Sequence, residues 1–197
     1  MTRSKSYFSG IAAMLLFIGC ASDPATHMAK HGIKTVAVEQ RVDAPTLRYG
    51  EKRGGSLQAA LTELTVDLVY TRRVKQITTV MQEHKIDVPA MVRSNFVTAI
   101  NDLGYGIAET QPDATFIVEL NQYGLEEKIF TSKIPFVVLD AELVKADGSV
   151  IWRGRSDGRK IDDPSLMGVK EWDEYERDPE RLRNDWNAVV RSGVANL

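Results

Sequence analysis

Few side chains in this 197-residue sequence could carry out covalent or metal chemistry. The only thiol is Cys20, and two of the three histidines, His27 and His31, stand four residues apart. On a helix, that spacing would place two imidazoles on one face, where they could bind a metal ion such as zinc. No third ligand lies near them in the sequence, so we expect a solvated segment and no metal site.

Sequence patterns typical of hydrolases and nucleotide-binding enzymes do not occur. The chain has no GxSxG, HExxH, GxxxxGK or GxGxxG pattern, and Ser132, Asp140 and the histidines do not have the spacing of a catalytic triad. We therefore expect no catalytic residues and no cofactor, and we interpret the chain as a protein that is not an enzyme. A hydrolase with an unrecognised site is the least favoured alternative, and it would require a polar cleft with perturbed carboxylates.

Residues 162–178, "DDPSLMGVKEWDEYERD", are densely acidic. Oxygen ligands suit calcium, but the spacing fits no calcium-binding loop and basic residues interrupt it, so a solvated segment is expected. Trp172 and Tyr175 lie among these charges. Exposed aromatic residues often mark partner surfaces, so both are candidate partner contacts. The alternative, that both rings fold back onto the sheet, is equally open.

The first nineteen residues have the form of an export signal. "MTRSKS" carries Arg3 and Lys5 without an acid, the uncharged run "FSGIAAMLLFI" follows at 8–18, and the small residue Gly19 comes after it. The eleven residues of that run would extend about 16 Å as a helix, well short of a bilayer core of about 30 Å. We therefore predict a cleaved signal over 1–19 rather than a membrane span.

The residues that end this signal, "FIGC" at 17–20, resemble the lipobox of bacterial lipoproteins. The resemblance implies a diacylglycerol thioether on Cys20, cleavage before it and acylation of the new amino group. Three acyl chains would anchor the protein firmly in a membrane. Ala21, rather than Asp, then favours the outer membrane by resemblance to the enterobacterial sorting pattern. The alternative is an ordinary signal peptide cut nearby, for example after Ala21.

The charge balance excludes a nucleic-acid-binding footprint. Without Arg3 and Lys5, the 25 basic residues fall to 23 against 27 acidic ones, a net charge of −4. No later apolar run is long enough to cross a bilayer. The length suits one domain over 34–197 behind a flexible tether at 20–33.

Hydrophobic periodicity predicts the elements of that domain. Residues 34–42 alternate as a strand, 56–84 form a long helical insertion that either bends or divides near 71–75, and 87–103 form a second helix. Strands are expected at 105–109, 114–123 and 135–144 and after the Asp147-Gly148 turn, with a last helix from Asp178. The pattern predicts an α+β fold, with an antiparallel sheet of about four to five strands and helices packed on one face.

The buried positions follow from the same patterns. On the helix over 87–103 the expected apolar face holds Val88, Val92, Phe96, Ala99 and Leu103. Trp152 and Trp186 fall on the apolar faces of their elements, so both are expected in the core.

Residues 87–158 resemble the small α/β domain of a superfamily of envelope lipoproteins. It includes the curli secretion channel lipoprotein and the penicillin-binding-protein activator lipoproteins. The resemblance lies in Gly104-Tyr105 before a strand, Asp113-Ala114 at the start of the next, the Asp147-Gly148 hairpin, and Trp152 near its end. It implies the fold of this region; the insertion at 56–84 and the acidic C-terminal region differ from the superfamily.

These observations predict an envelope lipoprotein anchored in the outer membrane through Cys20 and facing the periplasm. We expect it to act as a non-enzymatic binding, assembly or accessory module whose partner is another envelope protein. Its contact surface would be the open face or edge of the sheet. A lipid or glycolipid binding protein is the alternative, and it requires an apolar cleft. A homo-oligomer would show as an apolar patch on the 56–84 helix.

Overall fold

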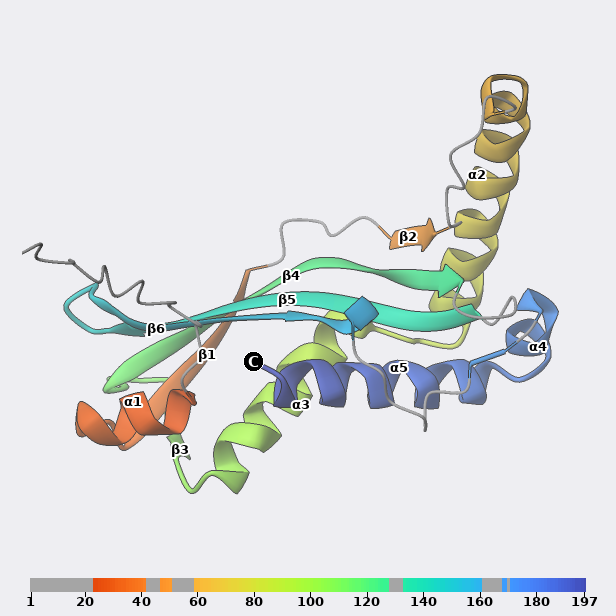
Figure 1. Cartoon of the computed structure of the whole chain (residues 1–197). Helices are drawn as coiled ribbons and strands as arrows, with labels where there is room; N and C mark the ends of the chain where they lie inside the picture. The colour runs from red at the N-terminus through yellow and green to blue at the C-terminus, as the bar shows by residue number, and fades with distance from the viewer. Residues whose placement is uncertain (1–22, 42–46, 51–58, 128–132, 161–167, 170) are drawn as a thin grey trace, which may run out of the picture.

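The computed structural model describes residues 23–41, 47–50, 59–127, 133–160, 168–169 and 171–197 (Figure 1). The elements in chain order are α1 (Pro24–Lys30), β1 (Thr35–Arg41), β2 (Leu47–Gly50), α2 (Ala59–Glu83), α3 (Val88–Asp102), β3 (Gly106–Ile107), β4 (Ala114–Glu127), β5 (Lys133–Lys145), β6 (Val150–Asp157), the 3₁₀ turn η2 (Gly158–Lys160), α4 (Trp172–Arg177) and α5 (Pro179–Ala195). The predicted signal peptide over 1–19 and Cys20 lie outside the described residues.

The sheet is mixed, so the prediction of an antiparallel sheet is correct only for part of it. Its order is β3-β1-β4-β5-β6, and β2 also pairs with β4. β4, β5 and β6 form the expected antiparallel meander, whereas β1 pairs in parallel with both β3 and β4. The chain between β1 and β4 contains α2 and α3, and a helical crossover of this length allows parallel pairing. The α+β class is confirmed.

One edge of β4 binds two strands in succession. β1 pairs with residues 114–119 of β4, and β2 pairs in parallel with residues 123–126. Between these two sections the β4–β5 register shifts at Leu120/Gln122, which marks a β-bulge.

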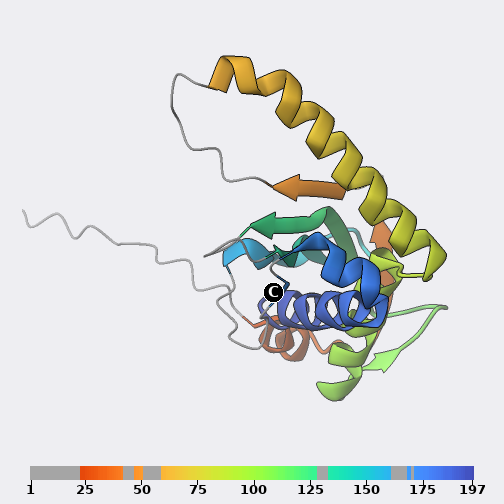
Figure 2. The same cartoon turned by 90° about the vertical axis from the view of Figure 1, so that its right-hand side faces the viewer.

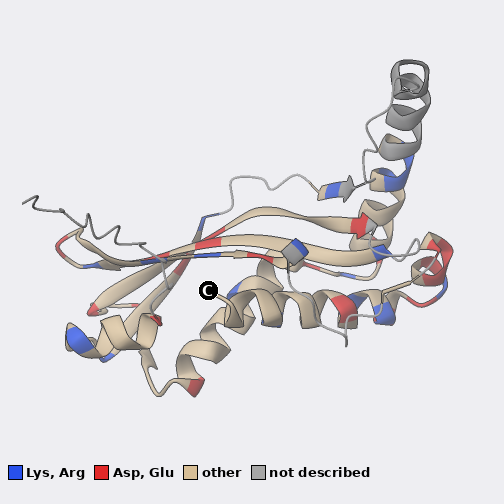
Figure 3. Cartoon of the chain, viewed as in Figure 1, with Lys and Arg blue, Asp and Glu red and all other residues tan. Residues whose placement is uncertain are grey.

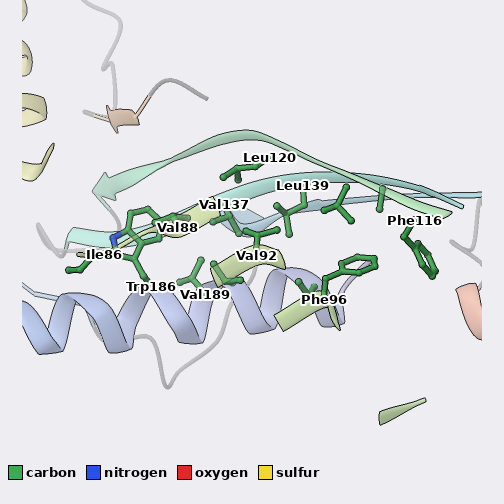
Figure 4. Close-up of a cluster of buried hydrophobic side chains, with 14 of the residues drawn as sticks. Ile86, Val88, Val92, Phe96, Phe116, Leu120, Val137, Leu139, Trp186 and Val189 are labelled. Carbon is green, nitrogen blue, oxygen red and sulfur yellow. The ribbon is translucent and has the colours of Figure 1, made fainter. Parts of the chain in front are cut away.

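Helices α1, α3 and α5 lie on one side of the sheet, and α2 rises on the other (Figure 2). The expected inward positions of β4 and β5 are buried against α3 and α5 (Figure 4). Trp152 of β6 and Trp186 of α5 are both buried in this core, as predicted. Phe96 contacts Phe116 edge to face at 5.1 Å between ring centroids, and Phe116 contacts Trp152 at 6.0 Å. This cluster joins α3, β4 and β6 into one core.

Local sequence signals account for the ends of these elements. Asp87 caps α3 by accepting a hydrogen bond from Ala90 N at 3.0 Å, and Asp178 caps α5 through Arg181 N at 3.1 Å. Gly148 turns the β5–β6 hairpin at a positive φ of 84°, where a side chain would be strained. On α3, however, Ile100 is buried and Leu103 is 48% exposed, because the helix ends at Asp102. The expected burial of Leu103 is therefore wrong.

Residues 24–30 form α1 rather than part of a flexible tether. Asp23 caps the helix through Ala25 N at 2.9 Å, and Met28 and Ile33 are buried in the core. Tyr105, which follows α3, donates a hydrogen bond from its hydroxyl to Ala25 O at 3.2 Å. Residues 23–33, which were expected to belong to the tether, are thus part of the packed domain.

The helical insertion is one continuous helix without a break at 71–75. Its last turns enter the core through Ile77, Val80 and Met81. The helix rises away from α3 and α5, so its first half extends beyond the body of the domain (Figures 1 and 2). Within the described ranges, no helix is both long enough and apolar enough to cross a membrane.

Candidate functional site: the outer face of the sheet

The face of the sheet turned away from α3 and α5 carries charged side chains in register; we call it the outer face. Along β4, β5 and β6 the inward positions are apolar except for Ser156, and the outward alternate positions include Glu119, Asp140, Glu142, Arg153 and Arg155. Side chains alternate between the two faces of a strand, so a residue between two buried ones points outward. Charges of both signs follow these strands in Figure 3.

Four neighbouring strands contribute one residue each to a transverse row of charges. Arg41 on β1 is in register with Glu119 on β4, which pairs with Asp140 on β5, which pairs with Arg155 on β6. Residues in register on adjacent strands lie on the same face, so the row reads positive, negative, negative, positive.

A second pair of charges extends the pattern along the strands. Glu142 on β5 pairs with Arg153 on β6, two residues along from Asp140 and Arg155. Arg153 Nε lies 2.7 Å from Glu142 Oε1, and Arg155 Nη1 lies 3.3 Å from Asp140 Oδ2. The arginine side chains are 70% and 65% exposed, so these ion pairs are open to solvent and contribute little to stability.

The β-bulge orients the carboxylate of Asp140. Asn121 lies within the bulge of β4 and donates from Nδ2 to Asp140 Oδ2 at 2.7 Å. Asp140 therefore accepts hydrogen bonds from both sides of its strand, one from Asn121 and one from Arg155. Its position is held by two neighbouring strands rather than by its own rotamer alone.

These side chains line a shallow depression of about 460 Å³. Three arginines and three acids surround it, and Ile117 is its only large aliphatic residue. Glu119 and Asp140 are like charges directly opposite one another, an arrangement that costs stability in a sheet. Each also neighbours an arginine in the row. The depression can thus bind groups of both signs, with carboxylates for ammonium or guanidinium groups and guanidinium groups for carboxylates.

The described residues provide no group of three or more His, Cys, Asp or Glu side chains placed to hold a metal ion. His27 lies in α1 and His31 follows it directly, so this stretch is helical, contrary to the expectation of a tether. The helix shows no further ligand beside the two histidines among the residues described.

For Trp172 and Tyr175 the sequence allowed either exposure at a partner surface or packing onto the domain, and the structure shows that both side chains are packed. Their exposed fractions are 2% and 0%, and their rings are 5.8 Å apart. In this conformation neither ring is available to a partner, because α4 turns both inward to cover the end of the core. Their neighbours in α4 remain solvated.

A buried polar contact secures α4 to α5. Tyr175 Oη donates to Asp185 Oδ2 at 2.7 Å and lies 3.3 Å from Lys133 O. Burial raises the pKa of the Tyr175 phenol well above its usual range, and burial likewise raises the pKa of Asp185. Among the described residues, Asp185 is the carboxylate whose pKa is raised by burial, and it does not line the depression. The contact connects two helices and a strand end, which is a structural role.

The open face of the sheet stays a predicted contact surface, and the sequence did not single out the residues that form the row. Each of these charged residues is nevertheless an outward alternate of a strand pattern, in "VEQRV", "IVEL", "LDAEL" and "WRGR". Their assembly into one row depends on register across four strands, which the sequence does not show.

No protein family model and no curated protein matches this chain. Among solved structures it is similar to protein XCC0632 from Xanthomonas campestris, of the DUF330 family, with 12% identity and a TM-score of 0.40 over 54% of this chain and 56% of that one. It is also similar to lipoprotein GNA1162 from Neisseria meningitidis, with 14% identity and a TM-score of 0.25 over 76% of this chain and 98% of that one. The chain thus spans just over half of the Xanthomonas protein. Structural similarity at this level supports no conclusion about the function of this chain.

Proposed function

We propose that this protein is a non-enzymatic envelope lipoprotein whose domain binds another envelope protein through the outer face of its sheet. Cys20, at the end of a signal-like segment, would carry the lipid and hold the domain at the outer membrane, facing the periplasm. The observation that carries the proposal is the charged, solvent-facing depression around Asp140 and Arg155. Anchoring would raise the local concentration of this surface near its partner.

The pattern of charges favours a protein partner over a lipid. A protein surface offers ammonium, guanidinium and carboxylate groups at fixed distances, which suits a row with a central pair of acids between arginines. The alternative of a lipid or glycolipid binding protein requires an apolar cleft. The depression is lined mainly by charged side chains, so it does not favour that alternative.

Two measurements test the proposal. The first is the intact mass of the protein extracted from membranes, beside a Cys20→Ala variant. We expect the mass of the chain from Cys20 with three acyl chains, and no acylation in the variant. A soluble, unacylated protein would contradict the anchor and the tethering mechanism with it.

The second measurement is site-specific photocrosslinking in intact cells. A photoreactive amino acid at Ile117, in the depression, should give a discrete crosslinked product, and one at the exposed Asn184 on α5 should not. Equal crosslinking at both positions would show that the outer face has no special role.

Charge variants make the crosslinking specific. Exchanging Glu142→Arg and Arg153→Glu preserves an ion pair across β5 and β6 but reverses its direction, so the fold should remain. We expect the exchange to abolish the Ile117 crosslink. The matched control, Arg191→Glu on the exposed side of α5, should leave the crosslink unchanged. A crosslink that survives the exchange would refute recognition through the Glu142–Arg153 pair beside the row.

A further inference from the structure

One end of the sheet collects the start of the packed domain and several turns. Val36 of β1 pairs with Ile107 of β3 and with Ala114 of β4, and Ala114 pairs with Lys145 of β5. The α3–β3 turn, the beginning of β4 and the β5–β6 hairpin therefore lie together; we call this the anchor end. The last turns of α2 and all of α4 lie at the other end (Figure 1).

The exposed large apolar side chains gather at the anchor end. Among the described residues these are Leu103, Ile107 and Val150, which are 48%, 37% and 39% exposed. Ile107 lies in β3 at this end, and Leu103 precedes it in the same turn. Val150 begins β6 and pairs with Val144, next to Lys145 in the hairpin. Two distant parts of the chain, the α3–β3 turn and the start of β6, thus contribute these side chains to one end of the sheet.

The chain leading to Cys20 also reaches the domain at this end. Tyr105, which lies between Leu103 and Ile107 in the turn, donates its hydroxyl hydrogen bond to Ala25 of α1. Helix α1 also packs on β6, the strand that Val150 begins. Helix α1 therefore lies beside the two elements that carry the exposed apolar residues, the α3–β3 turn and β6.

Few residues separate the anchor end from Cys20, the proposed position of the lipid. Cys20 precedes the helix cap Asp23 by three residues, so a fully extended chain separates their Cα atoms by at most about 11 Å. Because Met28 and Ile33 are buried, α1 cannot extend this reach without leaving the core. A domain on so short a connection stays next to the lipid headgroups rather than tens of ångströms away.

We propose that the anchor end of the domain lies on the lipid surface, with Leu103 and Ile107 in the interfacial layer of the membrane. The proposal rests on the lipid anchor of the proposed function and deepens it by assigning an orientation. Both signs of charge occur at this end, in Lys30 and Lys34 and in Asp102 and Asp113, so the short connection and the apolar side chains provide the association. In this orientation the first half of α2 points away from the membrane.

The test uses the acylated full-length protein in vesicles of phosphatidylethanolamine and phosphatidylglycerol. A thioether on Cys20 would leave no free thiol, so one introduced cysteine can carry a single nitroxide label. The sites are Leu103→Cys and Ile107→Cys, and the matched control is Thr79→Cys, which is exposed on α2 at the opposite end. Collisions of each label with oxygen, which partitions into lipid, and with a water-soluble nickel chelate report where it lies.

We expect the labels at 103 and 107 to lose nickel collisions and gain oxygen collisions relative to the label at 79. Labels at 103 and 107 as accessible to nickel as the control would overturn the orientation while the acylated mass still supports the anchor. An unacylated mass would overturn both. If the labels at 103 and 107 lose nickel collisions but their spectra also show dipolar broadening between labels, a second copy of the protein covers this surface. That result would overturn the lipid contact.

Discussion

Replacing Met28 with alanine tests whether α1 belongs to the cooperatively folded domain. Met28 is fully buried, and it belongs to the same core cluster as the residues of α3, β4 and β6. The substitution removes three heavy atoms, which corresponds to about 2 kcal/mol of lost transfer free energy. A residual cavity of about 60 Å³ would add about 1.4 kcal/mol. Since α1 can relax partly into that cavity, we expect a loss of about 2–3 kcal/mol in the free energy of unfolding.

The assay is urea unfolding of the chain from Ala21 onward, followed by tryptophan fluorescence and circular dichroism. Lys30→Ala is the matched control, because Lys30 is exposed on the same helix and should change the unfolding free energy by less than about 0.5 kcal/mol. A loss below about 0.5 kcal/mol for Met28→Ala would refute the packing of α1. The segment would then act as a tether, and the short connection between Cys20 and the domain would no longer hold.

Three further changes have defined outcomes. Tyr175→Phe leaves the half-buried Asp185 carboxylate without its 2.7 Å donor, so we expect a loss of about 1–3 kcal/mol in urea unfolding. Backbone hydrogen bonds from the start of β1 lower the pKa of Asp113, so its contribution to stability is present above the pKa of the unfolded chain and is lost as pH falls. Asp113→Asn should therefore lower the melting temperature at neutral pH and flatten its decline in acid; an unchanged acid limb would contradict this. Gly124→Ala would drive a methyl group into the backbone of β2, so hydrogen exchange in β2 should accelerate, whereas Gly106→Ala, whose nearest contact is 3.5 Å, should not change it.

The exposure of Leu103 shows where the helical pattern loses its predictive value. Spacing placed it on the apolar face of α3, yet the helix ends at Asp102 and Ile100 occupies the buried position. Element ends depend on capping and on what the next segment packs against, here α1 and β3. A periodic pattern predicts the face of a helix better than its last residue.

For the candidate site, too, one feature could be predicted from the sequence and another could not. The outward direction of these charged residues could be predicted, because each alternates along its strand with residues that point into the core. Their order, from Arg41 to Arg155, could not, because it depends on the register of residues more than a hundred positions apart. Likewise, the burial of Trp172 and Tyr175 follows from α4 folding onto α5, which no local pattern specifies.

Sequence alone thus determined the features that act over a few residues: the longer strands and helices, the start of the last helix at Asp178, the hairpin at Gly148, and the signal-like segment before Cys20. The tertiary structure alone decided that β1 pairs in parallel with β4, that α1 is packed, and that one end of the sheet gathers the exposed apolar residues. The physical reason is how far apart along the chain the interacting residues lie. Local hydrogen bonding and periodic burial depend on neighbouring residues, whereas strand pairing and docking depend on the free energy of contacts between distant segments.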